Sequence, residues 1–164
     1  MPSSRMQHIR PFYVMEVLER THALQRAGKP VIHMEVGEPD FPTPATIVQA
    51  GIEALQQGQT KYLQAAGLPE LRERITVHYP QPGRPDTAKV FVTPGSSTAL
   101  QMVFAAVVDP GDEVLMADPG YPCNANFVHL ADGRPIRVPC GAETQYQLTS
   151  DLIKANWTAR TSAV

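Results

Sequence analysis

From residue 88 onward, short β-type runs alternate with helical stretches, and this alternation constrains the fold more than any other feature of the sequence. Residues 89–93, 113–117 and 136–139 are predicted strands, and 162–164 has the character of the start of a fourth. Residues 96–108 and about 123–131 are apolar helical stretches that fall between them, and residues 151–156 suit one or two helical turns. Such alternation indicates βαβ units and a largely parallel sheet. We therefore expect an α/β protein with the 96–108 helix buried.

Prolines mark the element boundaries in the first half of the chain. The sequence has 16 prolines in 164 residues, against an average usage of about 5%. A helix is predicted from Pro11 to Gly28, then a short apolar run at 31–36, which ends at a segment too rich in proline for regular structure. Two more helices are predicted, one with Thr43 as its N-cap and Pro44 at its first position, the other beginning at Pro69. Residues 79–86 connect the two halves.

Composition and charge exclude several classes of protein. Apolar residues make up 43% of the chain and charged residues 18%, which is enough for a core and excludes a disordered chain. The net charge of −2 gives no electrostatic reason to expect a nucleic acid or an anionic membrane as a partner. Cys123 and Cys140 are too few for a disulfide framework and lack zinc-ligand spacing, so we expect no metal site. Because no signal core or membrane-spanning apolar run occurs, we expect a soluble cytoplasmic protein.

A glycine followed by small hydroxyl residues opens the helix that begins near residue 96. Gly95, Ser96 and Ser97 could form a cup for an anion, because the first-turn N–H groups and the helix dipole both attract negative charge. The alternative is that the two serines only cap the helix, and spacing alone slightly favours this alternative. The segment is neither a Walker loop nor a dinucleotide-binding loop.

A second loop of interest, residues 118–124, follows the next strand. Loops at the carboxyl ends of neighbouring parallel strands share one edge of the sheet, where open α/β folds bind ligands. Tyr121 could stack there on a flat cofactor, although a loop tyrosine more often packs against its neighbours. Cys123 could be a nucleophile, but no nearby group would lower its pKa, so a structural thiol is the better interpretation.

Five segments in a fixed order carry a resemblance to a known family. They are residues 37–44 (GEPDFPTP), 61–72 (KYLQAAGLPELR), 92–100 (VTPGSSTAL), 109–114 (DPGDEV) and 118–124 (DPGYPCN). Together they closely resemble class I/II aminotransferases, which are fold-type-I enzymes dependent on pyridoxal 5′-phosphate (PLP). The resemblance runs from about residue 10 to the last residue. It implies a PLP-dependent transferase-like three-layer sandwich with a mostly parallel sheet, of which this chain is the first half.

The resemblance implies a role for each matched site residue. The Gly95–Ser97 turn would hold the PLP phosphate, and Tyr121 would stack on the pyridine ring. Tyr62 would reach across a homodimer interface to the phosphate of the partner's cofactor, rather than being a solvent-facing loop tyrosine. Gly37 would lie against the substrate carboxylate, rather than being a turn glycine only.

The resemblance also implies how the chain is organised. We expect an N-terminal arm and helix (1–30), part of the small domain with an inter-domain and dimer loop region (31–86), and the first half of the large PLP-binding domain (87–164). An isolated half-domain would expose a sheet edge and apolar faces. We therefore expect the 164-residue chain to be poorly soluble or to self-associate.

The family's catalytic groups lie beyond the matched region. A PLP transaminase needs a Schiff-base lysine, an acidic partner for the pyridinium nitrogen and an arginine for the substrate carboxylate. None of the chain's lysines stands in the family's Schiff-base context: Lys29, Lys61, Lys89 and Lys154. We interpret the chain as an N-terminal portion, inactive alone, that contains no catalytic residue.

Two classes of function stay open. The first is transfer of an amino group between an α-amino acid and a 2-oxo acid through PLP, with a related PLP-dependent C–S lyase as an alternative within the family. The second is a remnant that binds PLP or phosphate, or dimerises, without catalysis. A transcriptional regulator of the pyridoxal type is disfavoured, because no helix-turn-helix domain precedes Pro11.

Overall fold

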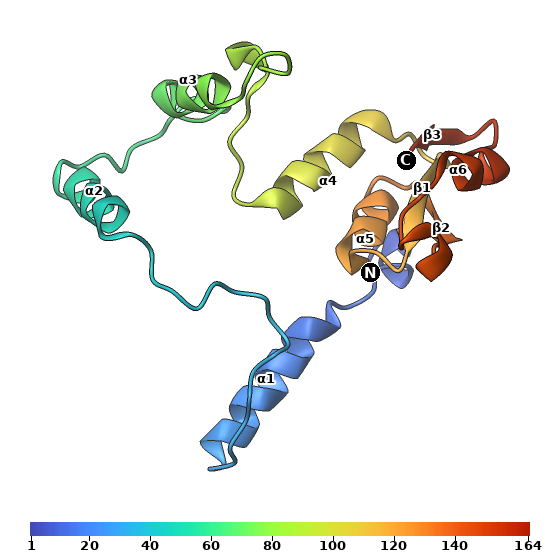
Figure 1. The fold of residues 1–164 in the computed structure, drawn as a ribbon, viewed down its shortest axis with the longest axis horizontal. Helices are drawn as coiled ribbons and strands as arrows, with labels where there is room; N and C mark the ends of the chain where they lie inside the picture. Colours follow the sequence, from blue (N-terminus) through green and yellow to red (C-terminus); the bar gives the residue numbers. More distant parts are fainter. The chain divides into compact units, whose positions relative to one another are not determined.

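The computed structural model describes all residues, 1–164, and divides into two units. The first unit consists of residues 1–16 and 94–164, and the second of residues 17–93. Figure 1 labels the elements along the chain. Helix α1 (Tyr13–Arg26) begins in the first unit and continues into the second. No helix in the structure combines the length and the apolar content that crossing a membrane requires.

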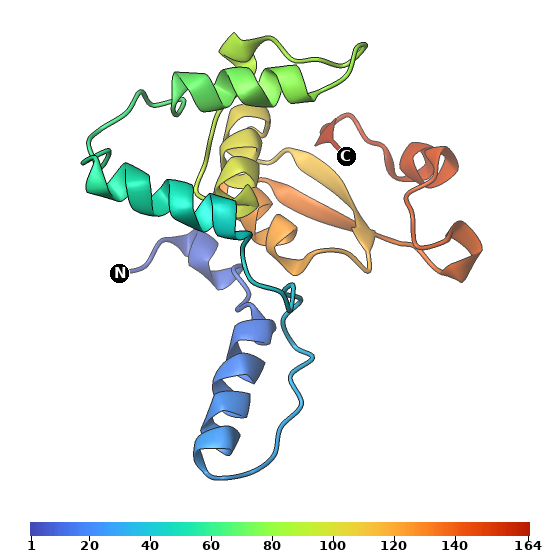
Figure 2. The same ribbon diagram turned by 60° about the vertical axis from the view of Figure 1, so that its left-hand side comes forward.

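The first unit is built on a parallel sheet of three strands, in the order β2-β1-β3. Strand β1 (Glu113–Asp118) pairs along its whole length with β2 (Arg134–Pro139), and its start pairs with β3 (Thr161–Ala163). The unit's helices are α4 (Ser96–Val107), α5 (Pro122–Leu130) and α6 (Ser150–Asn156), with short 3-10 turns η1 (Ser4–Gln7) and η3 (Ala142–Thr144). Figure 2 shows β1 and β2 side by side. The predicted α/β class and parallel sheet are confirmed.

The core of this unit lies where β1 meets α5. Val108, Val114 and Val128 form a buried cluster, and Phe104 and Met116 pack against it. Val108 is the C-cap residue that follows α4, Val114 belongs to the central strand β1, and Val128 belongs to α5, so this cluster joins three parts of the chain. Burial of these side chains from water is the main force that assembles the unit.

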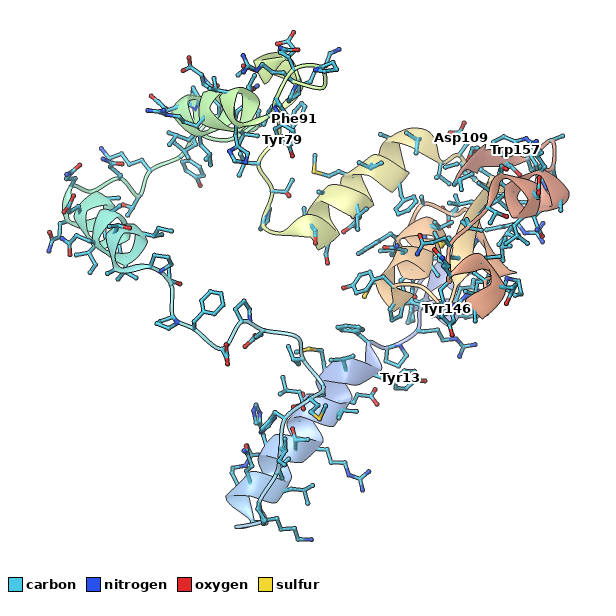
Figure 3. All side chains as sticks on the ribbon, in the orientation of Figure 1. Tyr13, Tyr79, Phe91, Asp109, Tyr146 and Trp157 are labelled. Atoms are coloured by element: carbon cyan, nitrogen blue, oxygen red, sulfur yellow. The ribbon has the colours of Figure 1, made fainter.

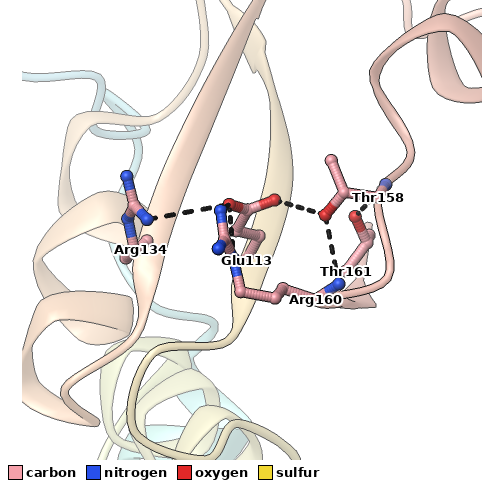
Figure 4. A network of polar contacts seen from close by, with 5 residues as sticks. All are labelled: Glu113, Arg134, Thr158, Arg160 and Thr161. Atoms are coloured by element: carbon pink, nitrogen blue, oxygen red, sulfur yellow. Dashed lines mark hydrogen bonds and ion pairs between the residues drawn. The ribbon is translucent and has the colours of Figure 1, made fainter.

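A carboxylate at the start of β1 links this strand to β2 and to the segment that leads into β3 (Figure 4). The side chain of Glu113 is only 5% exposed and accepts hydrogen bonds from the Thr158 hydroxyl at 2.7 Å and from Arg160 Nη2 at 2.6 Å. Arg134 of β2 lies 3.9 Å away on the other side. The Thr158 and Arg160 hydrogen bonds lower the pKa of this carboxyl group. The network was not predicted from the sequence.

The second unit contains most of α1, with α2 (Ala45–Gln56), α3 (Pro69–His78) and the 3-10 turn η2 (Thr87–Lys89). One guanidinium group ties α3 to the segment that follows η2. Arg72 donates from Nε to the carbonyl oxygen of Val90 and from Nη2 to that of Thr87, both at 2.7 Å. This arrangement gives the Val90 carbonyl a partner and adds a second donor to the Thr87 carbonyl of η2, which also accepts from the Val90 N–H.

One predicted strand is wrong. Residues 89–93 form no strand, because Arg72 occupies the Val90 carbonyl and the Val92 N–H donates to Ala66 instead. Residues 31–36, a short apolar run in the sequence, also form no strand. There the Glu35 carboxylate folds back to accept from the Met34 N–H at 2.9 Å, and no neighbouring strand offers a ladder.

The predicted helices are present, but two details of them are corrected. Helix α2 begins at Ala45 with Pro44 as its N-cap, so Thr43 does not cap it. Helix α4 contains no buried residue, and Met102, Val103 and Val107 are about half exposed. Many other large apolar and aromatic side chains lie on the surfaces of the two units, among them those labelled in Figure 3: Tyr13, Tyr79, Phe91, Tyr146 and Trp157.

Candidate functional site

The turn before α4 presents the first backbone N–H groups of a helix. Gly95 is the N-cap residue and has φ +86°, a conformation that favours glycine. No side chain caps the helix, and the backbone N–H groups of Ser96 and Ser97 have no acceptor in the protein. The alternative that the two serines only cap α4 therefore has no hydrogen bond to support it. The turn can accept an anion at a helix N-terminus.

Tyr121 lies beside this turn. It follows β1 and is the N-cap residue of α5. The pKa of its hydroxyl group is raised, chiefly by a hydrogen bond with the Cys123 side chain and by partial burial, while a hydrogen bond with Ser97 lowers it. Phe12 meets the Tyr121 ring edge to face, with centroids 6.0 Å apart. The structure thus brings Ser97 and Tyr121, from two separate loops, into contact at one end of the sheet.

A cavity of about 360 Å³ opens at the same place. Tyr121, Leu100 and Phe104 contribute to its wall, and Asn124 and Arg137 are among its polar lining residues. The Oδ1 atom of Asn124 is buried and has no hydrogen-bond partner. Pockets for small molecules commonly measure about 300–1,000 Å³ and combine apolar walls with a few polar groups. The cavity can therefore hold a flat ligand that brings a donor to Asn124.

The two remaining predicted site residues lie in the second unit. Tyr62 is fully exposed and makes no polar contact, and Gly37 is exposed in a segment without regular structure. Nothing lies within 4 Å of the position that a Gly37 side chain would take. The roles that the resemblance implies for them stay predictions.

Sequence reasoning missed two residues of the site. Asn124 stands three positions after Tyr121, which is about one helical turn, so its place near the ring could have been anticipated. Phe12 is more than 100 positions from Tyr121 in the chain, and no local pattern brings the two together. Its contact depends on how residues 1–16 join the rest of the first unit.

Comparison with known proteins identifies relatives over nearly the whole chain. Residues 29–163 match the family model for aminotransferase class I and II. A (5-formylfuran-3-yl)methyl phosphate transaminase from Methanocaldococcus jannaschii is 38% identical over 157 residues, which is 94% of this chain and 42% of that protein. An aspartate aminotransferase from Rhizobium meliloti is 33% identical over 162 residues, or 98% of this chain and 40% of that protein.

Solved structures agree with these relatives. The aspartate aminotransferase from Thermus thermophilus with maleate superimposes with a TM-score of 0.91 at 32% identity, over 98% of this chain and 43% of that one. The Rhizobium meliloti aspartate aminotransferase structure gives a TM-score of 0.87 at 33% identity, over 98% and 41% of the two chains. The chain thus spans about two fifths of the length of the relatives it matches, in agreement with an N-terminal portion. It belongs to the class I and II aminotransferase family.

Proposed function

We propose that this chain forms the PLP-phosphate and ring-stacking part of an aminotransferase that moves an amino group between an α-amino acid and a 2-oxo acid. Membership of the family supports the general class of reaction. The single observation that carries the proposal is the contact of Ser97 with Tyr121 beside the 360 Å³ cavity. That contact puts an anion-accepting turn and an aromatic ring at one site, as a phosphorylated ring compound requires.

The residues present fit PLP on chemical grounds. The free N–H groups of Ser96 and Ser97 and the positive end of α4 suit a phosphate. The Tyr121 ring suits a pyridine face, and the unpaired Asn124 Oδ1 can accept from a donor on the ring. When bound, PLP supplies the electron sink for chemistry at the amino acid's α-carbon.

The chain's own residues would orient the bound ring and position a proton donor beside it. Because its pKa is raised, the Tyr121 hydroxyl stays protonated at neutral pH and keeps a proton to donate. Phe12 packs against the edge of the same ring and limits its rotation. Excluding water from one face of the cavity strengthens the polar contacts inside it.

Further parts of the proposal rest on the second unit and on the cysteines. The exposed Tyr62 ring is free to contact the cofactor phosphate of a partner subunit in a homodimer, and Gly37 is free to adjoin a substrate carboxylate. Cys123 and Cys140 are unpaired thiols, which suits a reducing, cytoplasmic compartment.

For the chain alone we propose binding without turnover. No lysine lines the cavity, and Lys154, the only lysine of the first unit, is exposed on α6. PLP would therefore be held without a covalent bond, and no amino-group transfer would occur. This is the observation that favours a non-catalytic binding role for the 164 residues by themselves.

Equilibrium dialysis of the chain with PLP tests the proposal. Ser97→Ala should weaken PLP binding about tenfold, which is about 1.4 kcal/mol, because one hydrogen bond to a charged phosphate is lost. Ser150→Ala is the matched control, since Ser150 also opens a helix but lies on α6, away from the turn before α4. Equal affinity in the two variants would contradict the assigned phosphate site. A lysine adduct trapped by borohydride, or amino-group transfer by the chain, would refute the proposed lack of turnover.

A further inference from the structure

We propose that His8, Arg10, His129 and Arg137 form a second anion site in the first unit, which binds a small phosphate-type dianion. These residues line a cavity of about 590 Å³ between the N-terminal segment, α5 and β2. Phe12, Tyr13 and Cys123 contribute to its wall. None of the four residues belongs to the turn before α4, and His8, Arg10 and His129 lie outside the 360 Å³ cavity, which Arg137 alone of the four also lines.

The charge around this cavity is one-sided. The cavity is lined by two arginines and two histidines, and no aspartate, glutamate or lysine lines it. Neither Arg10 nor Arg137 forms an ion pair with any residue of the chain. By contrast, the arginines nearby are satisfied: Arg5 pairs with Asp132 at 2.8 Å, and Arg134 faces Glu113. The lining therefore lacks the negative charge that would balance it.

The backbone at Arg10 is held in place by a two-point clasp. The Arg10 N–H donates to Asn126 Oδ1 at 3.0 Å, and Asn126 Nδ2 donates to the Arg10 carbonyl oxygen at 2.8 Å. Asn126 and His129 are three positions apart on α5, so the helix presents both toward the N-terminal segment. Because the Asn126 side-chain amide bonds only the Arg10 backbone, it leaves the Arg10 guanidinium group available to a ligand.

The two imidazoles complete a preorganised set of donors. The rings of His8 and His129 are stacked, with centroids 5.3 Å apart and an interplanar angle of 26°. Burial lowers the pKa of His129, and repulsion from His8 and Arg137 lowers it further. Asp132, which lines the adjoining cavity with both histidines, is already paired with Arg5. A dianion between the rings and the arginines would remove this like-charge repulsion, and the pKa of His129 would rise on binding.

Titration of the whole chain with inorganic phosphate at low ionic strength tests the proposal. We expect saturable binding, and Arg137→Gln and Arg10→Gln should each weaken it about tenfold. Arg26→Gln is the matched control, because it removes the same charge from an exposed position at the end of α1 and should change the affinity less than about twofold. The His129 ring, followed by NMR, should titrate at higher pH when phosphate is present. The side chains of Arg10 and Arg137 form no hydrogen bond or ion pair within the chain, and unchanged circular dichroism would confirm that the variants fold.

Four results would overturn the proposal. One is the absence of saturable phosphate binding, and another is an equal loss of affinity in Arg137→Gln and Arg26→Gln. A loss of phosphate affinity in Ser97→Ala with none in Arg137→Gln would place the anion at the turn before α4 instead. Tighter binding of malonate than of phosphate would overturn the assignment to a phosphate-type ligand. A Ser97→Ala variant that loses PLP affinity but keeps phosphate affinity would support two separate sites.

Discussion

Replacing Gly133 by alanine tests how tightly the core of the first unit is packed. Gly133 precedes β2, where an added Cβ atom would lie 2.5 Å from Val108 Cγ1 and 2.9 Å from Val128 Cγ1. Both valines belong to the buried cluster, and Val128 is 0% exposed. A branched side chain held in a packed core cannot move aside cheaply. Overpacking of this kind costs about 1–3 kcal/mol, so we expect Gly133→Ala to destabilise the unit by that amount.

Urea unfolding followed by the fluorescence of Trp157, the chain's only tryptophan, measures this cost in the first unit. With a slope of about 1–3 kcal/mol per M urea, the midpoint should fall by about 1 M. Val108→Ala should make room, so the double variant should lose less stability than the sum of the two single variants. Gly51→Ala is the opposite case: it lies inside α2 with nothing within 4 Å, and helix propensity predicts a gain of about 0.4–1 kcal/mol. A Gly133→Ala variant as stable as the parent would refute the packing argument.

Three other predictions concern stability and association. Folding lowers the pKa of Glu113 from its ordinary value of 4.5, so this carboxylate stabilises the fold fully above pH 4.5 and loses that effect as the pH falls through the lowered pKa. Glu113→Gln should therefore make the free energy of unfolding less dependent on pH in the acid range. An unchanged pH dependence would contradict the stabilising role of the Glu113 network. Arg72→Lys should destabilise the second unit by about 1–3 kcal/mol, because an ammonium group cannot donate to both the Val90 and the Thr87 carbonyls as the forked guanidinium does. Thermal unfolding followed by circular dichroism would measure the loss, and an unchanged unfolding curve would contradict the stabilising role of these two hydrogen bonds. The exposed apolar faces of α2 and α4 predict self-association of the isolated chain in analytical ultracentrifugation, whereas a monodisperse monomer that unfolds cooperatively would contradict it.

Elements whose signals are local were predictable from the sequence. Strands β1 and β2 are bounded by Pro-Gly and Asp-Gly turns, and the intervening α5 has proline at its first position. Alternation of such elements leaves few topologies open, which is why the parallel sheet could be anticipated. The same reasoning failed at residues 89–93, which form no strand. An apolar run becomes a strand only where another strand pairs with it, and this depends on tertiary contacts that no local pattern contains.

Burial was less predictable than secondary structure for the same reason. The apolar residues of α2 share one face of the helix, yet Ile47 and Leu55 on that face are more than half exposed. Periodicity identifies which face of a helix is apolar but not whether another element covers it. The Glu113 network illustrates the converse: its partners, Thr158 and Arg160, are about 45 positions away, so a nearly buried carboxylate at a strand end could not be recognised from its neighbours.

The candidate site depends both on local sequence signals and on tertiary contacts. The Gly95–Ser97 turn and Tyr121 each follow from residues adjacent in the sequence, and the rule that neighbouring parallel strands deliver their loops to one edge predicted that they would meet. They do meet, although the segment before Gly95 is not a strand. The position of the turn therefore depends on α4, whose end packs Val108 into the core, rather than on a strand leading into it. It follows that the core contact and the site are mechanically linked: a substitution that shifts α4, such as Gly133→Ala through Val108, should weaken PLP binding without altering any residue of the cavity. If its PLP affinity is unchanged while its stability falls, the turn is held by something other than the packing of α4.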